Sequence, residues 1–227
     1  MISLQNVAYR YTHAAQDLFH DVALDIVPGG FFFVTGPSGA GKTTFLKLCY
    51  LDLLPSQGSV SVFGKDISTL DRDEIAVMRR RIGVVHQDCQ FLDHLSLYDN
   101  IALPLMVSGR QSLAEQNNLR ELLEWVGLSH RAKALPPELS GGERQRAALA
   151  RAIITSPDVI IADEPTGNID WEMSQRLLTL LIELNKMGKT IIVASHDIGL
   201  IRVAKTQVAS RILRISQQQI RIAGADL

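Results

Sequence analysis

The chain has 227 residues, of which 46% are hydrophobic and 21% charged, as in a globular protein with a sizeable core in one large α/β domain or two small ones. The formal net charge of −1 means that the chain has no overall positive charge that would attract nucleic acid. The two cysteines lack metal or redox spacing, which fits a reducing cytoplasm, and no apolar run approaches the roughly 20 residues of a membrane-spanning helix.

The first third of the chain alternates between predicted strands and helices. Residues 2–35 are expected to form strands, because Val22 to Ile26 alternates, Pro28-Gly29-Gly30 favours a turn and residues 31–35 form a short apolar run. A glycine-rich stretch follows this run directly. The further elements expected here are a helix at 42–51, a strand at 58–63, a charged helix at 71–81 and a strand at 82–85.

From about residue 95 to residue 135 the apolar spacing becomes helical. Leu97, Ile101 and Leu105 recur every four residues, and Gly127 ends a second helical run that starts near Leu113. We interpret this region as a helical insert within an α/β core.

The last third returns to alternating elements. After a helix from Ser140 to about Thr155, we expect a strand at 159–162, a helix at 171–187 and a strand at 190–194. This alternation favours a parallel sheet with crossover helices. The weakly alternating segment 212–222 is predicted to form a closing hairpin.

Residues 36–43 fit the phosphate-binding pattern G-x-x-x-x-G-K-[ST] between a predicted strand and a predicted helix. Glycines in such a loop let backbone N–H groups face phosphates at a helix N-terminus, which favours anions. Lys42 is expected to reach the β- and γ-phosphates, and the Thr43 hydroxyl is expected to bind Mg²⁺. The predicted nucleotide contacts are Gly36, Pro37, Ser38, Gly39, Ala40, Gly41, Lys42, Thr43 and Thr44.

Polar residues follow three other predicted strands, where parallel sheets bind ligands. Asp163 suits Mg²⁺, through water, and Glu164 suits polarising the attacking water as a general base. Gln87 could contact both Mg²⁺ and that water, and His196 could contact the γ-phosphate. Taken alone, Gln87 is more simply a surface loop residue, and His196 is more simply a satisfied or solvent-facing histidine.

The stretch Leu139–Glu143 predicts a second helix N-terminus that can bind an anion. Ser140 is a good N-cap, and Gly141 and Gly142 leave backbone N–H groups accessible. Two phosphate-binding ends in one protomer are redundant unless the second faces the nucleotide of another protomer. The simpler interpretation is an N-cap followed by a basic, solvated helix.

Together these motifs resemble those of ABC-type ATPases over nearly the whole chain. The resemblance implies a P-loop NTPase fold with a RecA-like core, an N-terminal antiparallel β subdomain and an α-helical insert. It implies one domain over 1–227, with about 1–94 and 156–227 as core and β subdomain and about 95–155 as helical subdomain. The motifs are Gly36–Thr43 (Walker A), Gln87 (Q-loop), Leu139–Glu143 (signature), Val159–Glu164 (Walker B), residues 167–170 including Asn168 (D-loop) and His196 (H-loop).

In this family two subunits pack head to tail and enclose two ATP molecules with Mg²⁺. The resemblance therefore implies a homodimer in the ATP-bound state, in which Ser140, Gly141, Gly142 and Glu143 close on the γ-phosphate of the other subunit. Asp170 is expected at that interface. Tyr11 lies where the family places an aromatic ring on adenine, and Tyr9 is a competitor for this position.

Within the family the chain most resembles the FtsE group of cell-division ATPases, through residues 35–42, 79–85, 99–105 and 162–168 and through Glu143 in place of the commoner Gln. That group implies a peripheral protein on the cytoplasmic face of the inner membrane, an integral membrane partner of FtsX type, control of cell-wall hydrolysis and no nucleic acid. The alternatives are the ATPase subunit of a lipoprotein-release or efflux system (LolD- or MacB-like), an amino-acid importer subunit, or a scaffold that binds ATP with little hydrolysis.

Overall fold

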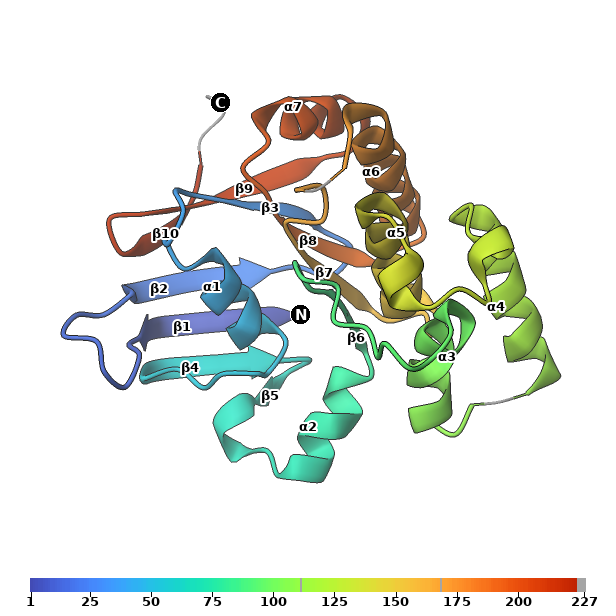
Figure 1. The fold of residues 1–227 in the computed structure, drawn as a ribbon. Helices are drawn as coiled ribbons and strands as arrows, with labels where there is room; N and C mark the ends of the chain where they lie inside the picture. Colours follow the sequence, from blue (N-terminus) through green and yellow to red (C-terminus); the bar gives the residue numbers. More distant parts are fainter. Residues whose placement is uncertain (111, 168, 224–227) are drawn as a thin grey trace.

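Two β-sheets and the helices around them form the protein in the computed structural model, which describes residues 1–110, 112–167 and 169–223 (Figure 1). The larger sheet has the strand order β10-β9-β3-β8-β7-β6 and is parallel apart from β10. This parallel sheet confirms the predicted α/β core. The strands are β3 (Phe31–Thr35), β6 (Ile82–Val85), β7 (Val159–Asp163), β8 (Thr190–Ala194), β9 (Ser210–Ser216) and β10 (Gln219–Ile222).

A smaller sheet with the order β2-β1-β4-β5 is antiparallel, as expected for the N-terminal β subdomain. Helix α1 (Lys42–Cys49) packs between the two sheets. Its buried residues Phe45 and Leu48 share one apolar cluster with Val60 of the small sheet and Ile161 of the large one. The strands of the small sheet are β1 (Ile2–Tyr9), β2 (Phe19–Ile26), β4 (Gln57–Val62) and β5 (Lys65–Asp66).

The large sheet is covered on both faces, which explains its near-continuous apolar strands. Side chains of β3 alternate between the faces, since Phe32 and Val34 join the cluster around α1 whereas Phe31 and Phe33 join a second cluster. The second cluster also contains apolar residues of three helices, which are α5 (Gly141–Ile153), α6 (Trp171–Lys186) and α7 (Ile198–Gln207).

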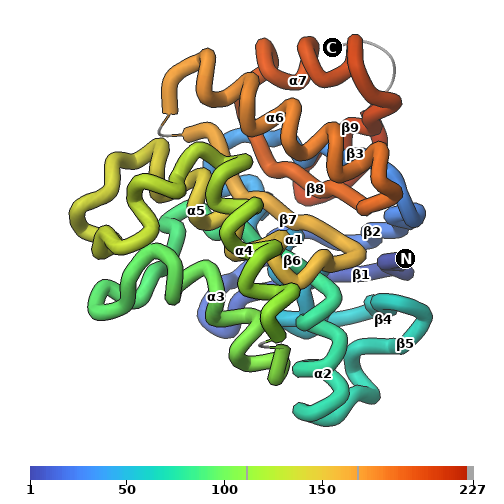
Figure 2. The backbone as a smooth tube through the Cα atoms, turned by 90° about the vertical axis from the view of Figure 1, so that its right-hand side faces the viewer, coloured from blue at the N-terminus to red at the C-terminus, as the bar shows by residue number. Residues whose placement is uncertain are grey.

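Helices α3 (Leu97–Val107) and α4 (Leu113–Trp125) pack with α5 through a third apolar cluster. Figure 2 shows the three helices next to one another, from the side of α4. Leu97 and Leu119 meet Ala147 and Ala150 there, whereas Ala148 on another face of α5 belongs to the cluster beneath the large sheet. Helix α5 is therefore the element that joins the helical region to the sheet. The division into core and helical subdomain stays a prediction.

Most predicted elements lie within a few residues of their expected bounds, including the C-terminal hairpin of β9 and β10. Helix α2 (Arg72–Arg79) lies within the predicted charged helix, and its N-cap Asp71 forms a capping box with Glu74. Helix α7 was not predicted. None of the helices in the described ranges is long and apolar enough to cross a membrane. Short 3₁₀ turns are formed by Ile67–Thr69, Ser129–Arg131 and Pro136–Glu138.

Candidate functional site

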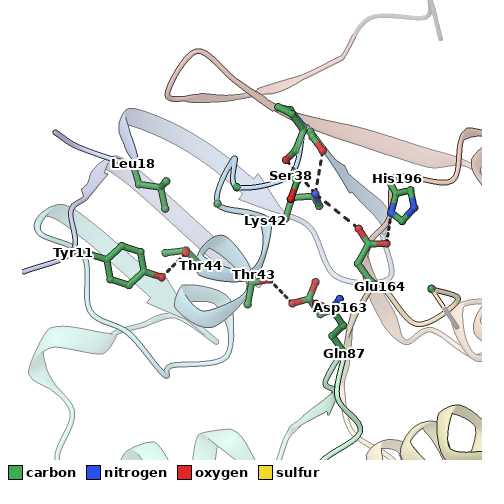
Figure 3. Close-up of a pocket in the computed structure, with 15 residues that line it drawn as sticks. Tyr11, Leu18, Ser38, Lys42, Thr43, Thr44, Gln87, Asp163, Glu164 and His196 are labelled. Atoms are coloured by element: carbon green, nitrogen blue, oxygen red, sulfur yellow. Dashed lines mark hydrogen bonds and ion pairs between the residues drawn. The ribbon is translucent and has the colours of Figure 1, made fainter. Parts of the chain in front are cut away.

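A cavity of about 760 Å³ lies at the carboxyl ends of four parallel strands, β3, β6, β7 and β8 (Figure 3). This edge is where open α/β sheets bind ligands. The sheet thus brings together residues that are far apart in the sequence. The cavity is lined by Tyr11, Leu18, Gly36, Pro37, Ser38, Gly39, Gly41, Lys42, Thr43, Thr44, Gln87, Asp163, Glu164, Gly167 and His196.

Two glycines of the loop before α1, Gly36 and Gly41, stand where other atoms approach closely. A Cβ atom at Gly36 would lie 2.6 Å from the carbonyl oxygen of Ile215. At Gly41, where φ is 99°, a Cβ atom would lie 2.8 Å from Leu18 Cδ2. Except for Ala40, which packs towards the core, every predicted phosphate-contact residue of this segment lines the cavity.

Lys42, Glu164 and His196 form a connected set of charged and polar groups. The Lys42 ammonium donates to the carbonyl oxygens of Gly36, at 3.0 Å, and Pro37, at 3.3 Å, and its Nζ lies 3.9 Å from Glu164 Oε1. Nδ1 of His196 is 2.9 Å from Glu164 Oε2. The Glu164 side chain is only 12% exposed, whereas that of His196 is 73% exposed. The carboxylate is therefore fixed from two sides, and His196 faces open solvent.

Asp163 is the buried acid of the site. The Thr43 hydroxyl donates to its Oδ2 at 2.6 Å, while Oδ1 has no hydrogen-bond partner in the described part of the chain. Burial raises the pKa of Asp163, and the neighbouring Glu164 adds to this effect, whereas the bond from Thr43 opposes it.

These oxygen donors fit Mg²⁺, which prefers hard oxygen ligands and is usually held by one or two carboxylates together with substrate phosphates and water. The buried, unpaired Oδ1 of Asp163 points to a cation or water at this position. Among the described residues, no group of three or more His, Cys, Asp or Glu side chains is placed to hold a metal ion.

The two tyrosines proposed from the sequence have different surroundings. Tyr11 is 48% exposed and lines the cavity, and its hydroxyl is 2.7 Å from Thr44 Oγ1. Tyr9 is 7% exposed and belongs to the core, where it meets Tyr11 edge to face. Only Tyr11 therefore presents its ring to a ligand in the cavity.

The signature residues lie elsewhere on the protomer. Ser140 caps α5 and forms a capping box with Glu143, whose Oε2 accepts the Ser140 N–H at 2.8 Å. A Cβ atom at Gly142 would lie 3.4 Å from Ile169 Cγ2, so the signature motif and the D-loop of one chain are neighbours. Asp170 caps α6 through a bond from the Met173 N–H, and Asn168 lies outside the described residues. Of the site residues predicted from the sequence and described by the structure, those that do not line the cavity are Ala40, Ser140, Gly141, Gly142, Glu143 and Asp170.

Two lining residues were not predicted as contacts of the ligand: Leu18, and Gly167, which was named only as the first residue of the D-loop. Leu18 stands between an irregular segment and β2, and nothing in the local pattern marks it. Gly167 follows the Walker B acids within three residues, and its N–H donates to the carbonyl oxygen of Glu164 at 3.1 Å. This second position could have been inferred from its closeness to Glu164 in sequence.

Comparisons with known proteins agree with this geometry. Residues 19–167 match the family model described as ABC transporter. The chain is 40% identical over 208 residues to the cell division ATP-binding protein FtsE of Bacillus subtilis, covering 92% of this chain and 91% of the relative. It is 41% identical over 201 residues to FtsE of Escherichia coli K12, covering 88% and 90% respectively.

Solved structures show the same fold. A dimeric ATP-binding cassette in a post-hydrolysis state bound to ADP and Pi is 33% identical, with a TM-score of 0.89 and coverage of 98% of both chains. A dimeric structure described as a bacterial ABC transporter cassette is 32% identical, with a TM-score of 0.87 and coverage of 97% of both chains.

Proposed function

Since the chain belongs to the ABC transporter family and is an ATPase of the ABC type, we propose that it is the motor subunit of a membrane complex. Two copies pack head to tail around two ATP–Mg²⁺ and drive an integral membrane protein. One observation carries this proposal: the cavity contains Lys42, Glu164 and His196, but not the signature residues of the same protomer.

In the proposed site the nucleotide phosphates bind to the N–H groups of the loop before α1 and to Lys42. The N-terminus of α1 supports this role, because a helix start attracts negative charge. The ring of Tyr11 stacks on adenine, supported by its exposed face and its bond to Thr44.

For hydrolysis, Glu164 takes a proton from the attacking water. Its contact with His196 Nδ1 orients the carboxylate and leaves the imidazole free to reach the γ-phosphate. Mg²⁺ would be held by Thr43, Asp163 and Gln87, and when bound it neutralises charge on the phosphates. Asp163 Oδ1 and Thr43 Oγ1 are the atoms of this chain best placed to hold it or its waters.

A second protomer completes the site by supplying Ser140, Gly141, Gly142 and Glu143, whose helix start faces the γ-phosphate, while Asp170 lies at the interface. The N-cap geometry of Ser140 supports this part, because it aligns the N–H groups of the first turn of α5 along one direction. The dimeric state of the solved cassettes supports it independently.

The cellular role that we propose is that of FtsE in cell division. Relatives of this name match about nine tenths of the chain. The protein then binds an FtsX-type membrane protein at the cytoplasmic face of the inner membrane and controls cell-wall hydrolysis, without nucleic acid. A transporter subunit of the LolD/MacB or amino-acid class is the alternative, favoured by the neighbour described as a transporter cassette.

Dimerisation is tested with Glu164→Gln, which keeps nucleotide binding but removes the base. With ATP and Mg²⁺ this variant is expected to elute as a dimer in size-exclusion chromatography with light scattering, and as a monomer without nucleotide. The control, Glu164→Gln with Lys42→Ala, is expected to stay monomeric. A monomer under all conditions, with ATP bound, would contradict the shared site.

The cellular role is tested by depletion in the source organism and by co-purification with the membrane protein encoded next to it. The cell-division role predicts chained or filamentous cells, and a partner with a large extracytoplasmic loop. Normal division together with retained lipoproteins or lost amino-acid uptake would favour the transporter alternative.

A further inference from the structure

The guanidinium of Arg151, near the end of α5, binds the chain just after Gln87. Nη1 donates to the carbonyl oxygen of Gln90 at 2.8 Å, and Nη2 donates to that of Cys89 at 2.9 Å. The same group lies 4.7 Å above the centre of the Phe91 ring. One side chain of the signature helix therefore contacts three consecutive residues of the Q-loop.

This loop has a backbone conformation that needs outside support. Cys89 and Gln90 have φ angles of 58° and 31°, in the left-handed region that residues with a side chain rarely occupy. Two consecutive residues of this kind persist only where neighbouring groups fix them. The guanidinium of Arg151 is partly withdrawn from water, and this burial lowers the pKa of Arg151. Charge-assisted bonds to carbonyl oxygens are stronger in such surroundings than in water.

The helix that carries Arg151 is itself fixed to the sheet. A Cβ atom at Gly83 in β6 would lie only 2.1 Å from the carbonyl oxygen of Ala152, so the end of α5 rests directly on the strand that leads into Gln87. Helix α5 begins at Gly141, next to its N-cap Ser140, ten residues before Arg151 and thus about 15 Å away at 1.5 Å per residue.

We propose that Arg151 is a positioning residue that fixes the loop after Gln87 to the signature helix α5. Gln87, which acts in the nucleotide site of its own protomer, and the signature residues, which act in the site of the other protomer, then move together. Arginine suits this task because its rigid fork donates to two carbonyl oxygens at once, which lysine cannot reproduce. The coupling of the two nucleotide sites rests on the proposed function. The fixing of the loop by Arg151 does not, because it concerns a single protomer.

The structural part is tested by thiol labelling, since the chain has only two cysteines. Cys89 lies in the loop and is 5% exposed, whereas Cys49 lies in α1 and is fully buried. Loss of charge-assisted bonds in Arg151→Ala is expected to speed N-ethylmaleimide labelling of Cys89 about ten-fold without nucleotide. The rate of Cys49 labelling, which requires opening of the core, is expected to stay unchanged. In Arg151→Lys the rate of Cys89 labelling is expected to lie between those of the wild type and Arg151→Ala.

A matched control separates this effect from general destabilisation. Arg81 also stacks on a phenylalanine, Phe63, at 3.8 Å, and donates to Asp158 at 2.7 Å, but it does not touch the loop. Arg81→Ala is expected to leave the Cys89 rate as in wild type. Equal acceleration of both cysteines in Arg151→Ala, or an unchanged Cys89 rate, would overturn the proposal.

The functional part uses the same variants. Arg151→Ala is expected to lower kcat about ten-fold with little change in the affinity of the monomer for ATP, and to weaken ATP-dependent dimers of Glu164→Gln. If Glu164→Gln forms no dimer even with Arg151 present, the proposed shared site fails instead. The coupling by Arg151 is wrong if two results are found together. The double variant Glu164→Gln with Arg151→Ala dimerises as tightly as Glu164→Gln alone, and kcat of the single variant Arg151→Ala equals that of the wild type.

Discussion

Replacing Asp163 with Asn is expected to stabilise the fold and to disable the enzyme. The carboxylate is 8% exposed, and its Oδ1 has no hydrogen-bond partner among the described residues. Burial and the nearby Glu164 raise its pKa, so the charged form is disfavoured in the folded protein. The asparagine keeps a carbonyl oxygen that can accept the bond from Thr43, and it carries no charge.

The size of the effect follows from the cost of a buried, unsatisfied acceptor, which is about 1–3 kcal/mol. Part of this gain is offset because the new amide NH₂ must also find a partner. We therefore expect the free energy of unfolding to rise by about 1–2 kcal/mol. For a domain of this size that corresponds to a Tm increase of about 2–8 °C. The loss of a group that stabilises the reacting charge is expected to lower kcat by about 10²–10³-fold.

The assay is urea unfolding without nucleotide, at about pH 7.5 and about pH 5. Because the folded-state pKa of Asp163 lies above its ordinary value of 3.8, the wild type gains stability as the pH falls through that folded-state pKa. The advantage of Asp163→Asn must therefore shrink towards acid. Asp158→Asn is the matched control, since Asp158 is 42% exposed and paired with Arg81, and no gain is expected there. An Asp163→Asn protein that is less stable than wild type at the higher pH would refute the reasoning.

Two further predictions concern packing and catalysis. Gly83→Ala places a Cβ atom 2.1 Å from the Ala152 carbonyl oxygen, so urea unfolding should show a loss of about 1–3 kcal/mol, and a stable variant would contradict this contact. His196→Ala removes the 2.9 Å contact with Glu164, and steady-state kinetics should show kcat lowered by about 10²–10⁴-fold, with ATP binding retained; an equal loss of binding would assign the imidazole to nucleotide affinity instead.

The secondary structure of the site could be predicted largely from the sequence, because its signals are local. The apolar runs before residue 36 and before Asp163 are strands, and Ser140 caps a helix as its position before two glycines indicates. Helix α7 was missed although Asp197 caps it and Leu200, Ile201 and Ala204 have helical spacing. Here the prediction stopped at His196, and the local signal was available.

Other features depend on tertiary packing and have no local signal. The sheet order, with β3 between β9 and β8, joins segments that are far apart in the sequence. The contact of Leu18 with Gly41 depends on how the chain enters β2, and the preference for Tyr11 over Tyr9 depends on which ring the core buries. The same is true of Arg151, because its hydrogen-bond partners are backbone carbonyl groups, which any residue type provides.

Helix α1 has a consequence for how this protein can evolve. Its apolar residues Phe45 and Leu48 are fully buried between two sheets, so the phosphate loop at its start is anchored to the centre of the molecule. Substitutions at the floor of the site are therefore expected to cost stability, because they disturb the packing that holds the phosphate loop. The rim of the cavity includes Tyr11, which is 48% exposed, so substitutions there are expected to cost less stability.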